Sequence, residues 1–532
     1  MKKLLSVLLA LAVLAILAVP AMAEGNMIYT ALSDDPQQMD PTLNSYARSS
    51  QVLQNLFKGL YKLDENGTMD EDGATYIPAM AEGVEISDDE LTYTFTLREG
   101  LKWSDGSDLT AYDFEYSWLR VLDPEVNSKA TSDLWIVKNG TAYYRGECAR
   151  EDVGIKAVDD RTFVVELENP TPWFLKLTST TSFLPVSKAA VEADENWAWS
   201  PATYVCNGPF LLKEYASLDK IVLEKNPYYY EADKVKLDGV QYSIIQTTDT
   251  ELNAYKRGEL NVSINLDQQG LSDYDGTDEL TRLPRIGIQY SDFNTQLPEF
   301  SDKRVRQAFA MSINRQILLQ AMGVIEQPVY GFVPYAQPSL TDPTKSYRDI
   351  AGDMFVEDVA AAQELMAEAG YPNGEGFPTI TIKVQSSPQQ RTLAQVLGDM
   401  WETYLGVKYD IQSRESGYWD ELDAGDFSVD RNGYTCDYDD PSANLKIWIT
   451  GSNAYENGWD DPVYDEMFNA TLAMTDDAER EAALIEAEKY LVDQMPGMPI
   501  YSMETQFLVK PEVSGVIANP IGHVNFEYAS VG

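Results

Sequence analysis

The chain has 532 residues, 40 of them basic and 85 acidic, which gives a formal net charge of −45. This balance argues against nucleic acid or an anionic membrane surface as a partner, because both carry negative charge. Hydrophobic residues make up 44% of the chain and aromatic residues 11%, values typical of folded globular proteins. The length is sufficient for two or three lobes with separate cores.

The first 23 residues have the features of a secretory signal peptide. Lys2 and Lys3 precede the apolar run LLSVLLALAVLAILAV, and Ala21-Met22-Ala23 gives the small-x-small pattern of a cleavage site. We expect cleavage near Ala23 and an extracytoplasmic mature protein, either periplasmic or at the cell surface. No later segment approaches 18 consecutive apolar residues, so we expect the mature protein to be soluble.

The sequence contains a single histidine, His523, and three cysteines. One histidine excludes nearly all histidine-based catalytic triads and multi-histidine zinc or iron sites, so we predict no metal and no cofactor. His523 lies in an apolar C-terminal segment, where we expect a structural role. Three cysteines permit at most one disulfide, and the sequence does not select a pairing among Cys148, Cys206 and Cys436.

In the first half of the chain, alternating hydrophobicity predicts a strand over 27–32 and a hairpin with strands around 210–215 and 220–224. Between the first strand and this hairpin, Thr110 is a plausible helix N-cap, with Asp113 three residues later. The apolar side chains that follow at helical spacing are more typical of a core than of a ligand platform. They are Phe114, Trp118 and Leu122.

The pattern changes after Gly287, where long helical segments appear. The predicted helices over 305–323, 356–370 and 390–406 each end at a glycine placed as a C-cap. A strand over 380–386 separates the last two, so this region is expected to be an α/β lobe.

The segment RNGYTCDYDDP, from Arg431 to Pro441, follows a predicted turn and a short strand. An aspartate at the end of a strand, beside an arginine and a glycine, could receive an ammonium group. A solvated surface loop is the alternative in so acidic a protein. Side chains alternate along a strand, so one face would carry Arg431, Gly433, Thr435 and Asp437.

Residues Ala81 to Arg120, AEGVEISDDELTYTFTLREGLKWSDGSDLTAYDFEYSWLR, resemble the signature block of extracytoplasmic solute-binding proteins of the oligopeptide/dipeptide family, family 5. Members of this family serve peptide ABC importers. The resemblance covers essentially the whole mature chain, in the family's order. It continues through SDDPQQMDPTLN, NGPFLLKEY, IVLEKNPYYY, AYKRGELN, FSDKRVRQAFAMSINR, AEAGYPNGEGFP, CDYDDP and LVKPEVSGV.

The resemblance implies an α/β, three-lobed, periplasmic-binding-protein-like fold of type II, in which two α/β lobes are joined by a hinge and accompanied by an extra lobe. Ligand would be enclosed between lobes I and III. By analogy, residues 1–23 are the signal peptide, lobe I comprises 24–47, 189–287 and 505–532, lobe II comprises 48–188, and lobe III comprises 288–504.

The resemblance also implies the ligand-binding residues. Asp437 matches the aspartate that holds the peptide amine, and an enclosed ammonium group needs such a counter-ion. Gly433 and Tyr434 match residues whose backbone pairs with the ligand, and Arg431 matches a basic residue of the same cleft. The facing segment would be Ser45, Tyr46 and Ala47, with Tyr290 and Gln385 at cleft-lining aromatic and amide positions.

Some positions depart from the family pattern. Tyr434 replaces the usual tryptophan, and Cys436 stands where a small residue is common. Residues 415–424 contain no Lys or Arg, so a basic clamp for the peptide carboxylate does not carry over from relatives that have one there. If the alignment holds, Cys206 and Cys436 both approach the cleft, where a disulfide would restrain lobe motion; free buried thiols are the alternative.

We therefore predict a non-enzymatic, monomeric receptor that binds peptides and docks on ABC permease subunits, without a nucleic-acid partner. An oligosaccharide or other small solute is the alternative ligand on the same scaffold, with the aromatic side chains of Tyr418, Trp419, Trp448 and Trp459 available for stacking. A secreted hydrolase using two carboxylates is a third hypothesis, although no catalytic motif supports it.

Overall fold

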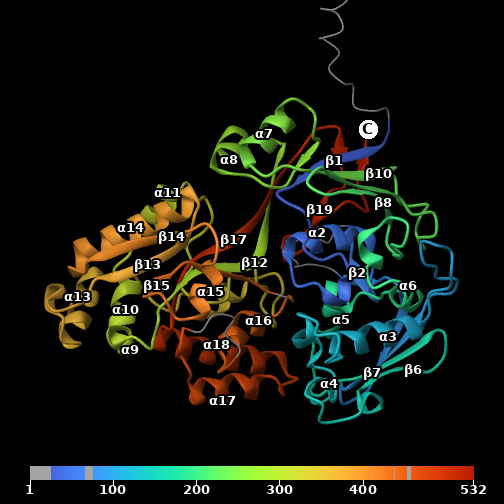
Figure 1. Ribbon diagram of the computed structural model, residues 1–532. Coiled ribbons are helices and arrows are strands. Elements are labelled where there is room, and N and C mark those ends of the chain that lie inside the picture. Colours follow the sequence, from blue (N-terminus) through green and yellow to red (C-terminus); the bar gives the residue numbers. More distant parts are fainter. Residues whose placement is uncertain (1–24, 66–75, 437, 452–456) are drawn as a thin grey trace, which may run out of the picture.

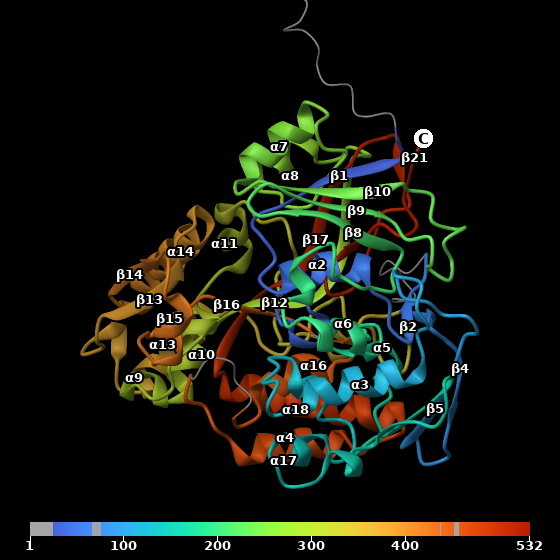
Figure 2. The ribbon, with the colours of Figure 1, turned by 45° about the vertical axis from the view of Figure 1, so that its right-hand side comes forward.

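The structure, a computed structural model, describes residues 25–65, 76–436, 438–451 and 457–532 (Figure 1). The predicted signal peptide lies outside the described residues. The elements form two sides of the molecule that are joined by the long strands β12 (Leu280–Asp292) and β17 (Gly497–Val509), as both ribbon views show (Figures 1 and 2). This arrangement is the three-lobed α/β fold that the sequence predicts.

Three sheets define the lobes, and we name lobes I, II and III after them. In lobe I, β1 pairs in parallel with β10, and the other pairings are antiparallel. Its order is β1 (Met27–Leu32), β10 (Gly239–Ile244), β9 (Lys220–Lys225), β8 (Phe210–Ala216). Lobe II has the antiparallel order β4 (Ala81–Ile86), β5 (Thr92–Leu97), β7 (Thr162–Glu166), β6 (Ile155–Ala157). Lobe III has the parallel order β14 (Tyr409–Arg414), β13 (Ile380–Gln385), β15 (Val429–Asp430).

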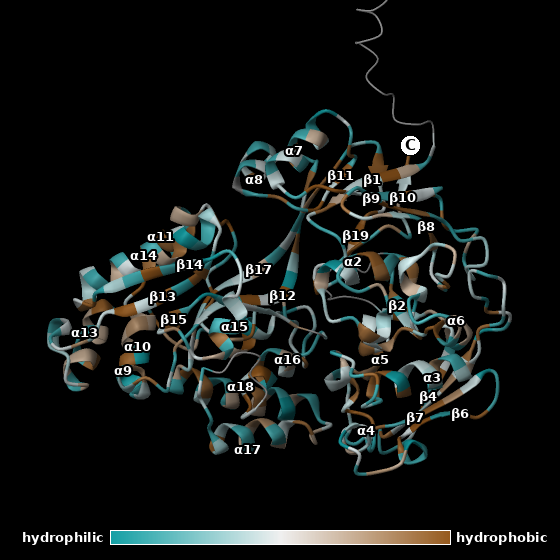
Figure 3. Ribbon diagram, in the orientation of Figure 1, coloured by the Kyte–Doolittle hydropathy of each residue, from teal (hydrophilic) through white to brown (hydrophobic). Residues whose placement is uncertain are grey.

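Helices cover these sheets, and brown and teal residues alternate along α14 and α18, as expected for helices with one buried face (Figure 3). The longer helices of the described chain are α2 (Ala47–Leu56), α3 (Ala111–Leu122), α7 (Thr248–Lys256), α10 (Lys303–Met311), α11 (Arg315–Met322), α13 (Val359–Glu368), α14 (Pro388–Leu405), α17 (Pro462–Thr471) and α18 (Asp477–Gln494). The shorter ones are α4 (Gly140–Tyr144), α5 (Phe174–Leu177), α6 (Lys188–Ala193), α8 (Gln268–Tyr274), α9 (Pro298–Ser301), α12 (Tyr347–Ala351), α15 (Tyr418–Asp423) and α16 (Ser442–Leu445). Short strand pairs are β2 (Tyr61–Leu63) with β3 (Tyr76–Pro78), β18 (Val513–Ser514) with β21 (Ser530–Val531), and β19 (Ile517–Ala518) with β20 (Val524–Asn525).

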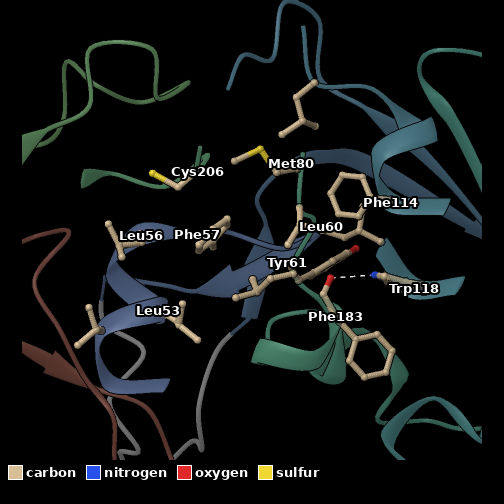
Figure 4. Close-up of a cluster of buried hydrophobic side chains, with 14 of the residues drawn as sticks. Leu53, Leu56, Phe57, Leu60, Tyr61, Met80, Phe114, Trp118, Phe183 and Cys206 are labelled. Atoms are coloured by element: carbon tan, nitrogen blue, oxygen red, sulfur yellow. Dashed lines mark hydrogen bonds between the residues drawn. The ribbon is translucent and has the colours of Figure 1, made fainter. Parts of the chain in front are cut away.

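Helix α3 begins where the sequence predicts. The backbone N–H of Thr110 donates to Asp113 Oδ2 at 2.8 Å, which is one half of a capping box. Phe114 and Trp118 are fully buried, and the Trp118 indole N–H donates to the Phe183 carbonyl at 2.8 Å (Figure 4). The same cluster contains Phe57 at the end of α2, so the predicted apolar stripe of α3 is core, as expected (Figure 4).

The single helix expected over 305–323 is wrong, because the structure has two helices there, α10 and α11. The second helix begins at Asn314, whose side chain accepts from the Ile317 backbone N–H at 2.9 Å. An asparagine N-cap competes with a continuing helix by hydrogen-bonding the backbone of the next turn. The predicted C-cap at Gly323 is confirmed, with a φ of 67°.

The hydrophobic side chains form two main cores, and β12 and β17 pass from one to the other. One core extends through lobes I and II and includes Phe507 of β17. The other lies in lobe III and includes Ile288 of β12 and Tyr501 of β17. Between these positions the register of β12 on β17 shifts, from Pro284 to Ile288. These two strands therefore connect lobe III to lobes I and II, and we call them the hinge strands.

A buried pair of acids lies at the lobe III end of these strands. The backbone N–H of Asp292 donates to Asp430 Oδ1 at 2.7 Å, and Asn432 Nδ2 donates to Asp292 Oδ2 at 2.9 Å. Burial, and then the charge of Asp292, raises the pKa of the Asp430 carboxyl well above its ordinary value, and burial raises the pKa of Asp292 to about 7. The folded protein therefore keeps a proton here at pH values where the unfolded chain has lost it.

Because of this bound proton, we expect the free energy of unfolding to depend on pH. Acids whose folded pKa is raised contribute stability that is complete below the unfolded pKa, near 4, and that is lost as pH rises toward the folded value, near 7 for Asp292. Asp430→Asn keeps the acceptor but removes the titration. The free energy of unfolding of this variant, relative to that of the wild type, should rise by about 1 kcal/mol per pH unit between pH 5 and 7. Urea unfolding at several pH values measures this difference, and a constant difference would contradict it.

Candidate functional site

A cleft of three adjoining cavities lies where the hinge strands, lobe II and the C-terminal loop meet. The cavities have volumes of about 360, 300 and 40 Å³, and Ile521 and His523 line all three. The largest is lined on the lobe I and II side by Asn44, Ser45, Ala47, Ser50, Gln54, Lys129, Ala130, Ser132, Asp133, Thr180, Thr181 and Ser182, and on the hinge and lobe III side by Arg285, Thr435 and Cys436.

This largest cavity brings together two segments that the sequence analysis selected separately. Ser45 and Ala47 contribute to one wall, and Thr435 and Cys436 contribute to the other. Tyr46, between the two small residues, is the N-cap of α2 and is 43% exposed. The predicted amine anchor Asp437 lies outside the described residues, directly after Cys436.

Strand β16 (Asn432–Thr435) contains the predicted ligand-pairing residues and stands at the edge of its sheet. The sheet order is β11 (Val262–Ser263), β17, β12, β16, so β16 pairs on one side with β12, where Gln289 faces Gly433. An edge strand can accept an extended chain on its other side. At Gly433 a Cβ would lie 2.0 Å from the Gln289 amide nitrogen, so a larger residue here would have to displace the end of that side chain.

Arg431 and Gln385 lie on lobe III but do not line the three cavities. The hydroxyl of Tyr418 donates to the Arg431 carbonyl at 2.6 Å, which fixes the backbone just before β16. Gln385 ends β13, where its backbone N–H donates to the Gln390 side chain at 2.8 Å. The side-chain amide of Gln390 donates in turn to Gln385 Oε1 at 3.0 Å.

Tyr290, expected to line the cleft, is 6% exposed and belongs to the lobe III core. Its ring packs against Phe332 and Trp448, with centroid separations of 6.4 and 5.5 Å. Tyr290 therefore does not line any of the three cavities, and its ring packs in the lobe III core.

The aromatic side chains considered for sugar stacking are mostly core residues. Tyr418, Trp448 and Trp459 are 3%, 1% and 8% exposed. Trp419 is 36% exposed but lines none of the three cavities. The stacking platform of the oligosaccharide hypothesis is therefore not formed by these residues.

None of the three cysteines forms a disulfide in this structure. Cys206 and Cys436 are buried and Cys148 is half-buried. Burial raises the pKa of the Cys206 thiol to about 12, so it is a neutral thiol at physiological pH. The disulfide alternative is not realised, and no bridge restrains the lobes.

Two cleft residues were missed by the sequence analysis, Arg285 and His523. Burial, and then the neighbouring charge of Arg285, lowers the pKa of the His523 imidazole to about 4, so the ring is neutral near pH 7. The expected structural role of His523 overlooked its place on all three cavity walls. No local motif marks either residue, because the C-terminal loop and β12 meet only in the folded protein.

Lobes II and III contact one another directly beside the cleft, through side chains that we call the interlobe latch: Trp173 and Lys176 of lobe II, and Tyr438 and Asp439 of lobe III. The Trp173 and Tyr438 rings are stacked, with centroids 5.3 Å apart and planes 5° apart. Lys176 Nζ lies 2.9 Å from Asp439 Oδ2. Tyr438 and Asp439 directly follow position 437 in the chain, so the lobe III half of the latch lies next to the predicted amine anchor in sequence.

Within the described part of the chain, no cluster of three or more His, Cys, Asp or Glu side chains is arranged to hold a metal ion. Among the same residues, no helix is long and apolar enough to cross a membrane.

Residues 75–456 match the family described as bacterial extracellular solute-binding proteins, family 5 Middle. This chain belongs to that family. Two relatives from Bacillus subtilis are the oligopeptide-binding protein OppA, 31% identical, and the dipeptide-binding protein DppE, 29% identical; each alignment covers 94% of this chain and 91% of the relative. Family 5 members are solute-binding proteins of the extracytoplasmic space.

Solved structures of similar proteins have the same fold. The oligopeptide-binding protein OppAIV of Borrelia burgdorferi superposes with a TM-score of 0.82 at 27% identity, covering 95% of this chain and all of the other. The murein tripeptide-binding protein MppA of Escherichia coli gives 0.81 at 29% identity, whereas its unliganded open form gives 0.72 at 28%. Coverage of this chain is 96% in both cases, so the lobes of this family 5 protein are arranged less like those of the open form.

Proposed function

We propose that this protein is the receptor of an ABC importer and that its ligands are peptides, enclosed between lobes I and III. The observation that carries the proposal is the edge strand β16, which faces the Ser45–Ala47 segment across one cavity. An extended peptide can add to such an edge through main-chain hydrogen bonds, which give affinity without selecting side chains. The names of the similar proteins, dipeptide-, oligopeptide- and murein-tripeptide-binding, support the same ligand class.

Asp437 is the proposed anchor of the peptide amine. It follows Thr435 and Cys436, which line the cavity, so a peptide paired with β16 would present its amino end close to this position. Gly433 and Tyr434 are the proposed backbone partners on β16, with Ser45, Tyr46 and Ala47 facing them. For Arg431 we propose a role in holding the strand, and none of direct contact for Tyr290 or Gln385.

Capture would close lobe III onto lobes I and II by rotation at the hinge, between Pro284 and Ile288. We propose the lobe boundaries given above, at 47/48, 188/189, 287/288 and 504/505. The mature protein would begin after cleavage near Ala23, act as a monomer, and deliver its closed form to permease subunits. It would release its ligand chemically unchanged, as a binding protein without catalysis.

Calorimetry with tri-alanine and N-acetyl-tri-alanine tests the amine anchor. We expect the free peptide to bind at least 10-fold more tightly than the acetylated one, because the acetyl group removes the charge that Asp437 would neutralise. Asp437→Asn should abolish this difference. Asp108→Asn, at a carboxylate that is 74% exposed on lobe II, is the control and should preserve it.

Two outcomes would contradict parts of the proposal. Equal binding of free and acetylated peptides by the wild type would remove Asp437 as the anchor. Binding of neither peptide, nor of longer unmodified peptides, would remove peptides as the ligand class.

A further inference from the structure

Basic side chains outnumber acidic ones on the described walls of the three cleft cavities, although the whole protein is acidic. Acids outnumber bases by 85 to 40 in the sequence, yet among the described residues the three cavities are lined by one acid, Asp133. The basic residues on the same walls are Arg48, Lys58, Lys62, Lys129, Lys176 and Arg285. Such a local excess of basic side chains favours an anionic ligand in a protein that is acidic overall.

Four of these cations already have carboxylate partners. Lys58 and Lys62 both pair with Glu527. Lys176 pairs with Asp439 in the latch, and Arg48 lies 3.9 Å from Asp34. These four positive charges therefore have counter-ions within the protein. Arg285 and Lys129 are the two cations of the described cavity walls that have none.

Arg285 and Lys129 form no ion pair with any described residue, and both line the largest of the three cleft cavities. The Nε of Arg285 is buried and has no hydrogen-bond partner among the described groups. Burial also lowers the pKa of this guanidinium, which nevertheless stays charged near neutral pH. The Arg285 side chain as a whole is half-buried, and a bound anion would supply the counter-ion that the described residues do not.

The backbone places Arg285 where β12, β16 and the C-terminal loop meet. It lies in the stretch where β12 leaves its register with β17, between Pro284 and Ile288. The carbonyl of Ile286 accepts from the Cys436 backbone N–H at 2.9 Å, and the N–H of Ile286 donates to the Pro520 carbonyl at 2.8 Å. Arg285 is thereby held between the end of β16 and the C-terminal loop, where a Cβ added to Gly522 would lie 2.9 Å from its Nε.

We propose that Arg285 is a carboxylate-binding residue of the cleft, with Lys129 as a second cation on the lobe II wall of the same cavity. The inference rests on the proposed peptide-binding function and specifies the ligands further. A guanidinium binds a carboxylate through two parallel hydrogen bonds, so the preferred peptides carry a carboxylate close to their amino end.

Position 437 directly follows Cys436, and a strand advances by about 3.3 Å per residue. The bound carboxylate therefore belongs to one of the first residues after the amine. It has two possible sources: an acidic side chain, or the terminal carboxylate of a very short peptide. Both present the same planar group to Arg285, and the experiment distinguishes them.

The test uses four tripeptides, Ala-Glu-Ala and Ala-Gln-Ala, each with a free or an amidated C-terminus, in calorimetry with the full-length mature protein. We expect the wild type to bind at least one carboxylate-bearing member 10-fold more tightly than the doubly neutral Ala-Gln-Ala amide. A preference within the Glu/Gln pair identifies a side-chain carboxylate, and a preference within the acid/amide pair identifies the terminal one.

Arg285→Gln should reduce that preference to about twofold. Arg285→Lys, which keeps the charge but loses the planar fork, should retain part of it. Arg282→Gln is the matched control, because Arg282 is on the same strand but pairs with Glu504 and lines none of the cavities. It should preserve the full preference.

A wild type that binds all four peptides equally overturns the role of Arg285 while leaving the proposed function intact. A preference that survives in Arg285→Gln also overturns it. Binding of none of the four contradicts the peptide-binding function itself, and the inference fails with it. Thermal unfolding of each variant confirms that the compared proteins are folded.

Discussion

A Glu527→Gln variant should lose about 3–5 kcal/mol of unfolding free energy, because it removes the single carboxylate shared by two buried lysines. Lys58 Nζ lies 3.1 Å from one oxygen of Glu527, and Lys62 Nζ lies 2.6 Å from the other. All three side chains are no more than 5% exposed. Burial by itself would raise the pKa of the Glu527 carboxyl, but the two lysines outweigh it and hold that pKa below its ordinary value.

Glutamine preserves the size of the side chain and an acceptor for the Tyr229 hydroxyl, which donates to Glu527 at 2.6 Å. The charge is lost. Lys62 keeps a second carboxylate, Glu231, at 2.5 Å, whereas Lys58 is left with the Gln54 carbonyl. The cost therefore falls mainly on Lys58, which must stay charged without a counter-ion or give up its proton.

Urea unfolding of the wild type and the variant measures this loss. Because Glu527 stabilises the core shared by lobes I and II, the unfolding step of that core should move to lower urea concentration. Glu166→Gln is the control: its pair with Lys138 is about half exposed on both sides, and exposed pairs contribute 1 kcal/mol at most. A loss from Glu527→Gln no larger than that of the control would show that Lys58 is not dependent on Glu527.

The same region explains why the cleft wall could not be predicted from the sequence. The C-terminal segment reaches α2 through hydrogen bonds between residues 473 positions apart, which join Gln51 to the backbone of Val524. Such contacts leave no periodic pattern in either segment. Arg285 and His523 were missed for this reason, since each stands in an unremarkable stretch of sequence.

Local signals were predicted well where they depend on neighbouring residues. The capping box at Thr110 and the strand over 27–32 are short-range features, and the structure confirms both. The helix over 305–323 was wrong because apolar spacing persists across Asn314, while the backbone hydrogen bond of that side chain restarts the helix. Periodicity alone does not distinguish one long helix from two helices that bury the same face.

Family resemblance supplied the fold and the segment around position 437, but it predicted individual contacts less well. It placed Tyr290 on the cleft, and the ring lies in the lobe III core instead. A ligand-facing position and a core-facing position differ by one residue along a strand, so small changes of register change which side chains reach the cavity.

The interlobe latch gives the second large expected effect. A protein lacking it, Trp173→Leu with Lys176→Ala, should bind its peptides about 30- to 100-fold more weakly, which corresponds to about 2–3 kcal/mol. The latch joins lobe II to the segment that follows position 437, so we expect it to form when lobe III closes. Ligand binding and latch formation then favour the same state, and loss of one weakens the other.

The size of this expected loss of binding free energy follows from the contacts in the latch. The stacked rings of Trp173 and Tyr438 contribute about 0.5–1.5 kcal/mol. Arg480, whose guanidinium carbon lies 4.5 Å from the centre of the Trp173 ring, adds a cation–π contact. The pair of Lys176 with Asp439 contributes less, because the lysine side chain is 36% exposed. Lys176→Ala by itself should therefore weaken binding by no more than about 10-fold.

Calorimetry and small-angle X-ray scattering together separate the latch from general damage. With saturating peptide, the wild type should become more compact, whereas the double variant should need a higher peptide concentration to reach the same compact state. Lys188→Ala, on lobe II but in an exposed pair with Glu192, is the control and should bind as the wild type does. If the double variant kept wild-type affinity, the latch would contribute equally to the open and closed forms, and closure would depend on the ligand contacts and the hinge alone.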